Sequence, residues 1–262
     1  MPGTIRKGLE VAAADLAVGF PAANAETIKK VIRILKGTVA EALTGVSCSQ
    51  WGLHIQAEYG KLVDESLKLV SAPAVRDGMR HAGRLFILLS QIAETFKGDG
   101  SKSLLSWKKS ATPIEKLDEV RVELDQLRTY LGSILGDLRT TQTRLEEINK
   151  ELEQKKEELD VWSIAAQFLS EHLGASDSRA PHLLGQSLTL TKMVARITEG
   201  AQLRQSTIDE VDALADKIQE GILVTLPAWI EKVSLTFQKT SVTETERYTL
   251  REGLEEILNK LK

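Results

Sequence analysis

Leucine recurs every seven residues through the middle of the chain, and most residues three positions further on are apolar as well. This spacing is the a/d heptad pattern of a helix that packs against another helix. No proline interrupts it, so the seven repeats predict one helix, roughly 60 Å long at about 1.5 Å per residue. A helix of that length exceeds a single compact core and must lie along a partner. The leucines are Leu117, Leu124, Leu131, Leu138, Leu145, Leu152 and Leu159, followed three positions later by Val120, Leu127, Ile134, Thr141, Ile148, Lys155 and Trp162.

A second long helix is predicted after a short loop. The heptad helix begins at Thr112-Pro113-Ile114-Glu115, where threonine, proline and glutamate take their preferred cap, first and third positions, and it runs to about Leu173. Glycine, serine and proline mark 174–181 as a loop, and the next helix spans 183 to about 238. A short loop between long helices indicates antiparallel neighbours. The seam of the second helix consists of Leu190, Val194, Ile197, Ala201, Arg204, Ile208, Val211, Ala215, Ile218, Ile222, Thr225 and Trp229.

Shorter helices are predicted on both sides of this hairpin. Apolar residues recur with helical spacing in four earlier segments, and Thr243-Glu244-Thr245-Glu246 can cap one last helix. The earlier segments are 5–18, 24–43, 50–70 and 75–96, with a turn at 98–101; the last helix carries Tyr248, Leu250, Leu254, Ile257, Leu258 and Leu261. No segment has the pattern of a strand. The sequence therefore predicts an all-α fold: a long antiparallel coiled-coil helical hairpin with additional shorter helices packed alongside.

The composition agrees with a helical protein. Aromatic residues make up 5% of the chain and there are six prolines, which favours helices because strands prefer aromatic and β-branched residues. The length of 262 residues is enough for one large or two ordinary domains. By its pattern the chain divides into an N-terminal helical region (1–100), the hairpin region (101–240) and a C-terminal helix (241–262).

The charge pattern argues against a nucleic-acid partner. The net charge of −3 gives no overall attraction to nucleic acid or to anionic lipid. Leucine zippers that dimerise on DNA also show heptad leucines, but a dense basic region stands directly before the first of them. Here only Lys102, Lys108 and Lys109 precede it, and Pro113 follows them. We therefore expect no nucleic-acid partner.

Cysteine usage and hydropathy favour the cytoplasm. Cys48 is the single cysteine, so no internal disulfide is expected, and the start of the chain has no signal-peptide pattern. The best apolar run, Ile222–Ile230, has nine residues and includes Pro227, whereas a membrane span needs roughly 18. We therefore expect a cytoplasmic protein with no stable membrane span.

Catalytic and metal-binding patterns are not recognisable. The four histidines are not spaced as metal ligands on a helix, and Cys48 has no basic residue nearby in sequence to activate it. No glycine-rich loop suggests a phosphate site. We therefore predict no catalytic residue, no metal and no cofactor. The histidines are His54, His81, His172 and His182.

Three polar residues interrupt the predicted seams: Thr141, Lys155 and Arg204. Such residues usually fix the register of two helices at some cost in stability, which is the structural interpretation. The functional alternative is an anion site, in which Arg204 and a neighbouring amide, Gln202 or Gln205, bind an oxyanion by charge-assisted hydrogen bonds.

Residues 217–229, with the sequence KIQEGILVTLPAW, resemble the KIQ-x-x-I-x-x-x-IP-x-W signature of the toxic anion resistance (TelA/KlaA) family. Residues 202–204 match the family's P-Q-I-R region, and 188–192 match the L-x-L-T/S-R run before it. The helix end at 159–166 is similar to the family's L-x-x-Y-I-A-A. The resemblance covers about 104–235, in the family's order.

The resemblance implies a bacterial, mostly cytoplasmic protein linked to tolerance of tellurite and other toxic anions or to envelope stress. The family has no established catalytic residues, so none are carried over. The leading hypothesis is a non-enzymatic toxic-anion resistance and stress-response protein that acts through helix-mediated association, with a protein partner or itself, and with an oxyanion as a further ligand. The expected anion- or partner-binding residues are Gln202, Arg204, Lys217 and Gln219, and the expected kink residues are Pro227 and Trp229.

Alternative functions need features that the sequence does not show. A helical-bundle protein that acts at membranes, such as a component of a multi-part pore-forming toxin, would conceal an apolar hairpin long enough to span a bilayer. A reductase of the anion would need a redox centre, which one cysteine and scattered histidines do not supply. A generic coiled-coil scaffold needs only the heptads and remains open.

Overall fold

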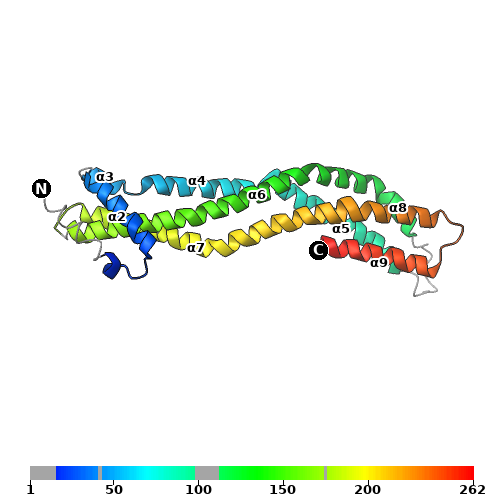
Figure 1. Cartoon of the computed structure of the whole chain (residues 1–262). Helices are drawn as coiled ribbons and strands as arrows, with labels where there is room; N and C mark the ends of the chain where they lie inside the picture. The colour runs from blue at the N-terminus through cyan, green and yellow to red at the C-terminus, as the bar shows by residue number, and fades with distance from the viewer. Residues whose placement is uncertain (1–15, 41–42, 98–111, 174–175) are drawn as a thin grey trace, which may run out of the picture. The chain divides into compact units, whose positions relative to one another are not determined.

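The computed structural model describes residues 16–40, 43–97, 112–173 and 176–262. Every regular element within these ranges is a helix, so the predicted all-α fold is confirmed. The predicted turn at 98–101 and most of the predicted helix 5–18 lie outside the described residues. The elements in Figure 1 are α2 (Ala25–Ala40), α3 (Gly45–Ser49), α4 (Leu53–Val70), α5 (Pro73–Lys97), α6 (Pro113–Leu173), α7 (Ala180–Asp216), the π-helix η1 (Lys217–Thr225), α8 (Leu226–Phe237) and α9 (Glu244–Leu261).

The chain forms two compact units, each built from segments that are distant in sequence. Unit 1 comprises Met1–Leu67 and Glu146–Gln205, and unit 2 comprises Lys68–Leu145 and Ser206–Lys262. The boundaries between them fall inside α4, α6 and α7, so the units cut across the regions 1–100 and 101–240.

Helix α6 buries its heptad leucines as the spacing predicts. All seven are at most 4% exposed, and burial of one such side chain contributes about 1.5–3 kcal/mol. The residues three positions after each leucine are buried less uniformly. Val120, Leu127, Ile134, Thr141 and Ile148 are buried, whereas Lys155 and Trp162 are half-buried. Packing along this seam therefore stabilises the long helix in both units.

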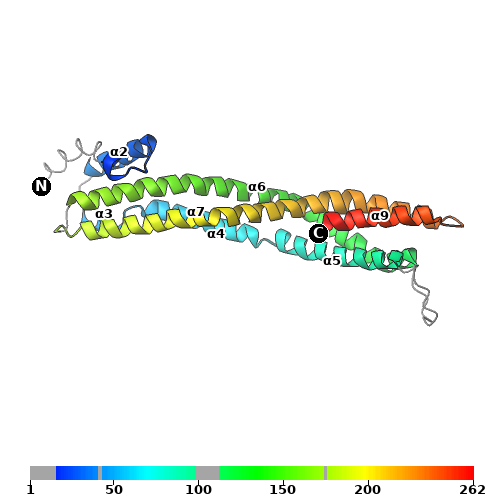
Figure 2. The ribbon, with the colours of Figure 1, turned by 90° about the horizontal axis from the view of Figure 1, so that it is seen from below.

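In unit 1, α6 and α7 run antiparallel. The Ser170 hydroxyl donates to the Ala180 carbonyl at 2.9 Å, and Arg204 Nε donates to Asn149 Oδ1 at 2.8 Å. Residue numbers therefore rise along one helix as they fall along the other. The two helices lie side by side in both Figure 1 and Figure 2.

In unit 1, α3 and α4 meet at a glycine turn that lies against α7. Gly52 has φ +72°, a conformation that favours glycine, and a Cβ atom there would come within 3.1 Å of Leu190 Cδ1. The helix predicted at about 50–70 is α4, which begins at Leu53, whereas the short helix α3 before Gly52 was not predicted from the sequence. Next to the turn, Trp51 Nε1 donates to the Trp162 carbonyl at 3.0 Å, which fixes the corner on α6.

Unit 2 is a helical bundle, and α5 and α9 contribute side chains to its core. Helix α9 packs against α5, η1 and α8, and Leu250, Leu254, Ile257 and Leu261 line the core as the sequence predicts. Tyr248, also predicted on this apolar face, is instead 60% exposed. No helix among the described residues has both the length and the apolar character needed to cross a membrane.

A capping box begins α9, and its glutamate makes the unit sensitive to acid. Lys239 Nζ donates to Glu246 Oε1 at 2.6 Å, and the Thr243 backbone N–H donates to Glu246 Oε2 at 2.9 Å. These bonds, the lysine bond foremost, lower the pKa of Glu246 to about 2 from an ordinary value of 4.5. A carboxyl group whose pKa falls on folding stabilises the folded state above its unfolded pKa, and loses that effect as the pH falls towards 2.

We expect Glu246→Gln to reduce the loss of stability between about pH 4.5 and pH 2, because the glutamine carbonyl still accepts from Thr243 but does not titrate. The measurement is urea denaturation at several pH values, with Glu244→Gln in the same helical turn as control. If both variants followed the wild-type pH profile, Glu246 would not be the group responsible.

Candidate functional site

The segment that resembles the family signature contains a change of helix type. Pro227 has no N–H group, so it cannot make the α-helical hydrogen bond to the carbonyl four residues earlier. Residues Lys217–Thr225 wind as a π-helix, and the Leu226 N–H donates to the Gly221 carbonyl five positions back. Helix α8 then resumes with Pro227 in its first turn. The predicted kink residue is thus accommodated by a wider turn before it.

One position of the predicted seam differs in the structure. The sequence predicts Thr225 at the seam between Ile222 and Trp229, but Thr225 is half-buried and Leu226 is fully buried in its place. The Thr225 hydroxyl donates to the Glu220 carbonyl at 2.7 Å. The Lys260 ammonium group of α9 approaches the same hydroxyl oxygen at 3.4 Å. A long π-helix is rare and often marks a functional position, which makes this segment the candidate site.

Trp229 anchors the segment to α9. Its indole ring is 4% exposed, and Nε1 donates to the Leu250 carbonyl at 2.8 Å. The ring lies against Gly253, where a Cβ atom would stand 3.0 Å from Trp229 Cδ1. Glycine at 253 is therefore needed for the close approach of α8 and α9. Sequence reasoning missed Gly253, because an isolated glycine in a helical pattern gives no sign of what it faces.

We expect Gly253→Ala to destabilise unit 2 by about 1–3 kcal/mol, because the buried indole cannot move away from the added methyl group. Gly136→Ala on α6 is the matched control: a Cβ atom there meets nothing within 4 Å, so alanine raises helix stability by up to about 1 kcal/mol. Chemical denaturation of both variants measures the difference. Equal stability of the two would contradict the close packing of Trp229 on Gly253.

A guanidinium network ties α6 to the start of the π-helix. Arg139 Nη1 donates to Asp212 Oδ1 at 2.6 Å and to Gln142 Oε1 at 3.1 Å, while Nη2 donates to Asp216 and, at 3.3 Å, to Gln219 Oε1. The bond to Asp216 is the main cause that raises the pKa of Arg139. Gln219, expected to bind an anion or a partner, thus contacts a cation of its own chain. The four-residue spacing of the two aspartates on one face of α7 was the signal available in the sequence.

Arg204 lies in the seam of unit 1 with its donors directed to groups of the same chain. Besides the bond to Asn149, Nη2 donates to the Ile197 carbonyl at 3.0 Å and reaches Glu153 Oε1 at 3.4 Å. Burial lowers the pKa of the guanidinium, while the carboxylate acts in the opposite direction. Gly200 leaves the space for it, since a Cβ atom there would be 2.9 Å from Nη1. The guanidinium therefore holds the helix register.

The remaining expected residues fall into different units. Gln202 is exposed on α7 in unit 1, and Lys217 is half-buried at the first position of η1 in unit 2. Lys217, Gln219, Pro227 and Trp229 share the candidate segment, but Gln219 is exposed whereas Trp229 is buried against α9. Among the described residues, no group of three or more histidine, cysteine or acidic side chains is placed to hold a metal ion.

Comparisons with known proteins add no relative: no family model matches the chain, and neither the curated proteins nor the solved structures contain a significant match. The candidate site is therefore defined by its geometry. Hydrogen bonds and packing hold its inner face in place, and the groups that it offers to a partner are the exposed side chains of a helix.

Proposed function

We propose that this chain is a non-enzymatic, cytoplasmic protein of toxic-anion (tellurite-type) resistance that acts through helix-mediated association. The link to toxic anions rests on the resemblance of residues 217–229 to the family signature. The proposal of association rests on one structural observation: the stretch 217–237, which contains this segment, has a buried inner face and exposed apolar residues on its outer face.

The two faces of the segment differ in what they contact. The inner side chains are buried in the core of unit 2: Ile218, Ile222, Leu226, Trp229 and Val233. On the outer face, Val224 is 65% and Leu235 is 57% exposed, and Ala228 is exposed between them. Apolar residues that follow at four and seven positions share one side of a helix. This outer face is suited to a second helix with an apolar stripe.

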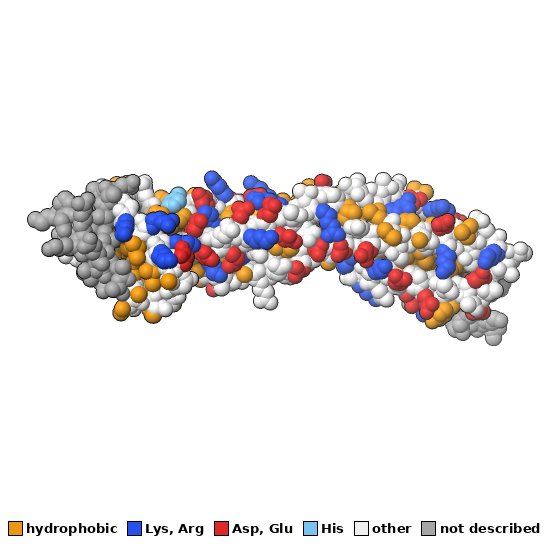
Figure 3. Space-filling model, in the orientation of Figure 1, with side chains coloured by type: hydrophobic (Ala, Val, Ile, Leu, Met, Phe, Trp, Pro, Cys, Tyr) orange, Lys and Arg blue, Asp and Glu red, His pale blue; other side chains and the backbone are white. Residues whose placement is uncertain are grey.

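Charged groups of both signs border the outer face. Ala228 and Leu235 line a shallow hollow of about 300 Å³, whose other lining residues include Glu231, Lys232 and Lys239. An apolar centre with a mixed polar rim is typical of a protein interface. Figure 3 likewise shows acidic and basic side chains intermixed over the face in view, rather than separated by sign. The pattern favours a protein helix over a polyanion as the partner.

The double variant Val224→Glu/Leu235→Glu tests this surface, with Val122→Glu on α6, 70% exposed in the same unit, as the matched control. Sedimentation velocity and in-cell cross-linking under tellurite would detect the complex between this face and its partner helix. We expect the wild type and Val122→Glu to form this complex and the double variant not to form it. A complex that survives the double substitution would exclude this face as the interface.

A further inference from the structure

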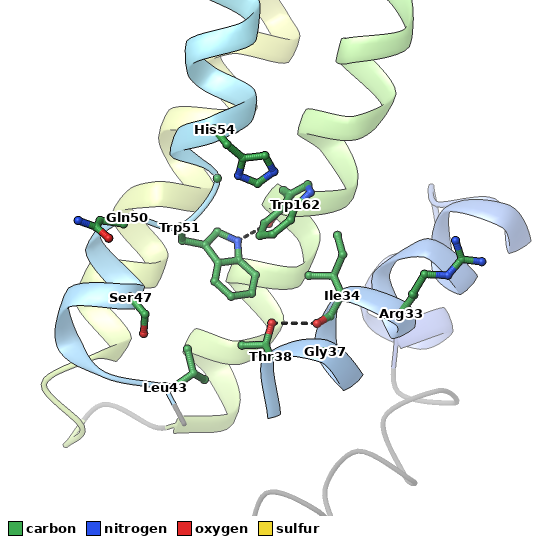
Figure 4. Close-up of a pocket in the computed structure, with 11 residues that line it drawn as sticks. Arg33, Ile34, Gly37, Thr38, Leu43, Ser47, Gln50, Trp51, His54 and Trp162 are labelled. Atoms are coloured by element: carbon green, nitrogen blue, oxygen red, sulfur yellow. Dashed lines mark hydrogen bonds between the residues drawn. The ribbon is translucent and has the colours of Figure 1, made fainter. Parts of the chain in front are cut away.

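Unit 1 contains a cleft that the proposed function does not use. It has a volume of about 530 Å³ and lies between α2 and the corner where α3 turns into α4, with Trp162 of α6 on a further side (Figure 4). Volumes of 300–1,000 Å³ are usual for sites that bind small organic molecules. Gly37 lines the α2 wall, where a Cβ atom would meet nothing within 4 Å. A larger side chain at position 37 therefore fits without a clash.

Three aromatic rings form one side of the cleft. Trp51 and Trp162 meet edge to face with ring centroids 5.0 Å apart, and His54 stands over Trp162 at 4.9 Å in the same manner. Figure 4 shows the three rings next to one another, with Ile34 of α2 facing Trp51 and Trp162. The hydrogen bond from Trp51 to the Trp162 carbonyl holds the indole in place. A preformed aromatic wall of this kind binds flat apolar groups.

The hydroxyl groups at the cleft are already engaged as donors. Thr38 Oγ1 donates to the Ile34 carbonyl at 2.8 Å, a bond drawn in Figure 4, and Ser47 Oγ donates to the Thr44 carbonyl at 2.9 Å. In the same view Gln50 points away from the aromatic rings. A ligand body in the cleft thus meets mainly carbon, so an apolar body fits it best.

Among the described residues, the titratable ones that line the cleft are Arg33, which extends from the outer side of α2 in Figure 4, and His54. Helix α2 also carries Lys36 and Lys30 outside this lining, and Lys30 lies 3.6 Å from Glu157 of α6. The described part of the rim therefore favours a negative charge on the part of a ligand that faces solvent.

We propose that this cleft is a binding site for a small organic anion with an aromatic body. The body lies against the half-buried Trp162 and the small exposed edge of Trp51, and the anionic group lies at the rim near Arg33 and His54.

Two dyes with the same aromatic body test separately whether the cleft binds this body and whether it prefers an anion. They are the anion 8-anilinonaphthalene-1-sulfonate and the neutral N-phenyl-1-naphthylamine, titrated by fluorescence into the folded full-length chain. We expect one site for the anionic dye. The series Gly37→Ala, Gly37→Leu and Gly37→Trp should weaken its binding progressively, by about tenfold or more for the larger side chains, equivalent to about 1.4 kcal/mol.

The control series is Gly185→Ala, Gly185→Leu and Gly185→Trp on α7, where a Cβ atom also meets nothing within 4 Å but which does not line this cleft. It should leave dye binding unchanged, with thermal unfolding showing that both series fold. Equal binding by wild type and Gly37→Trp, or equal loss in both series, would overturn the site.

The double variant Arg33→Gln/His54→Gln should weaken binding of the anionic dye about threefold to fivefold and leave binding of the neutral dye unchanged. Equal loss of both dyes would overturn the preference for an anion.

Discussion

Replacing Trp229 with alanine is expected to lower the free energy of unfolding of unit 2 by about 3–5 kcal/mol. The indole is buried among η1, α8 and α9, it donates to the Leu250 carbonyl, and Gly253 beside it has no side chain that could fill the cavity. Trp229→Phe keeps most of the ring and loses the donor, which should cost about 1 kcal/mol from the hydrogen bond. Urea denaturation followed by circular dichroism measures both values.

Leu235→Ala is the control for this experiment, because Leu235 lies on the same helix and is more than half exposed. It should change stability by no more than about 0.5 kcal/mol. A Trp229→Ala variant as stable as Leu235→Ala would mean that the signature tryptophan does not anchor α8 to α9. The inner face of the candidate site would then have no fixed shape.

The second large effect is expected in unit 1, where Leu159→Ala should cost about 2–5 kcal/mol. Leu159 is fully buried in the seam of α6, and its removal leaves a cavity between helices that other packing holds in place. Leu203→Ala on α7 is the matched control, since Leu203 is 73% exposed and its loss should change stability by less than about 0.5 kcal/mol. Equal effects of the two substitutions would show that the heptad spacing does not define the packed face.

The heptad pattern predicted α6 well because burial of one helix face depends on a regular spacing within a single stretch of sequence. Each leucine recurs at the spacing that returns a side chain to the same face, so burial of the whole set follows from the sequence alone. The polar seam residue Arg204 was also visible as an interruption of the pattern. Its partners Asn149 and Ile197 were not, because they depend on how two distant segments align.

The π-helix could not be read from the sequence. Pro227 indicates a defect in the helix, but a kink and a wider turn both relieve the missing hydrogen bond, and only packing decides between them. Here the Leu226 N–H donates to the Gly221 carbonyl five residues back, which shows that the chain takes the wider turn. The cleft of unit 1 was also unpredictable, since Trp51, Trp162 and Gly37 come from segments whose meeting depends on the tertiary fold.

Growth of a bacterial host on graded tellurite tests directly whether this chain confers toxic-anion resistance through the outer face of η1 and α8. Four strains are compared: empty vector, wild type, Val122→Glu, and Val224→Glu/Leu235→Glu, with equal protein levels in the last three. We expect a higher inhibitory concentration for the wild type and Val122→Glu, and a value near that of the vector for the double variant. If the wild type grew no better than the vector, the toxic-anion function would be contradicted.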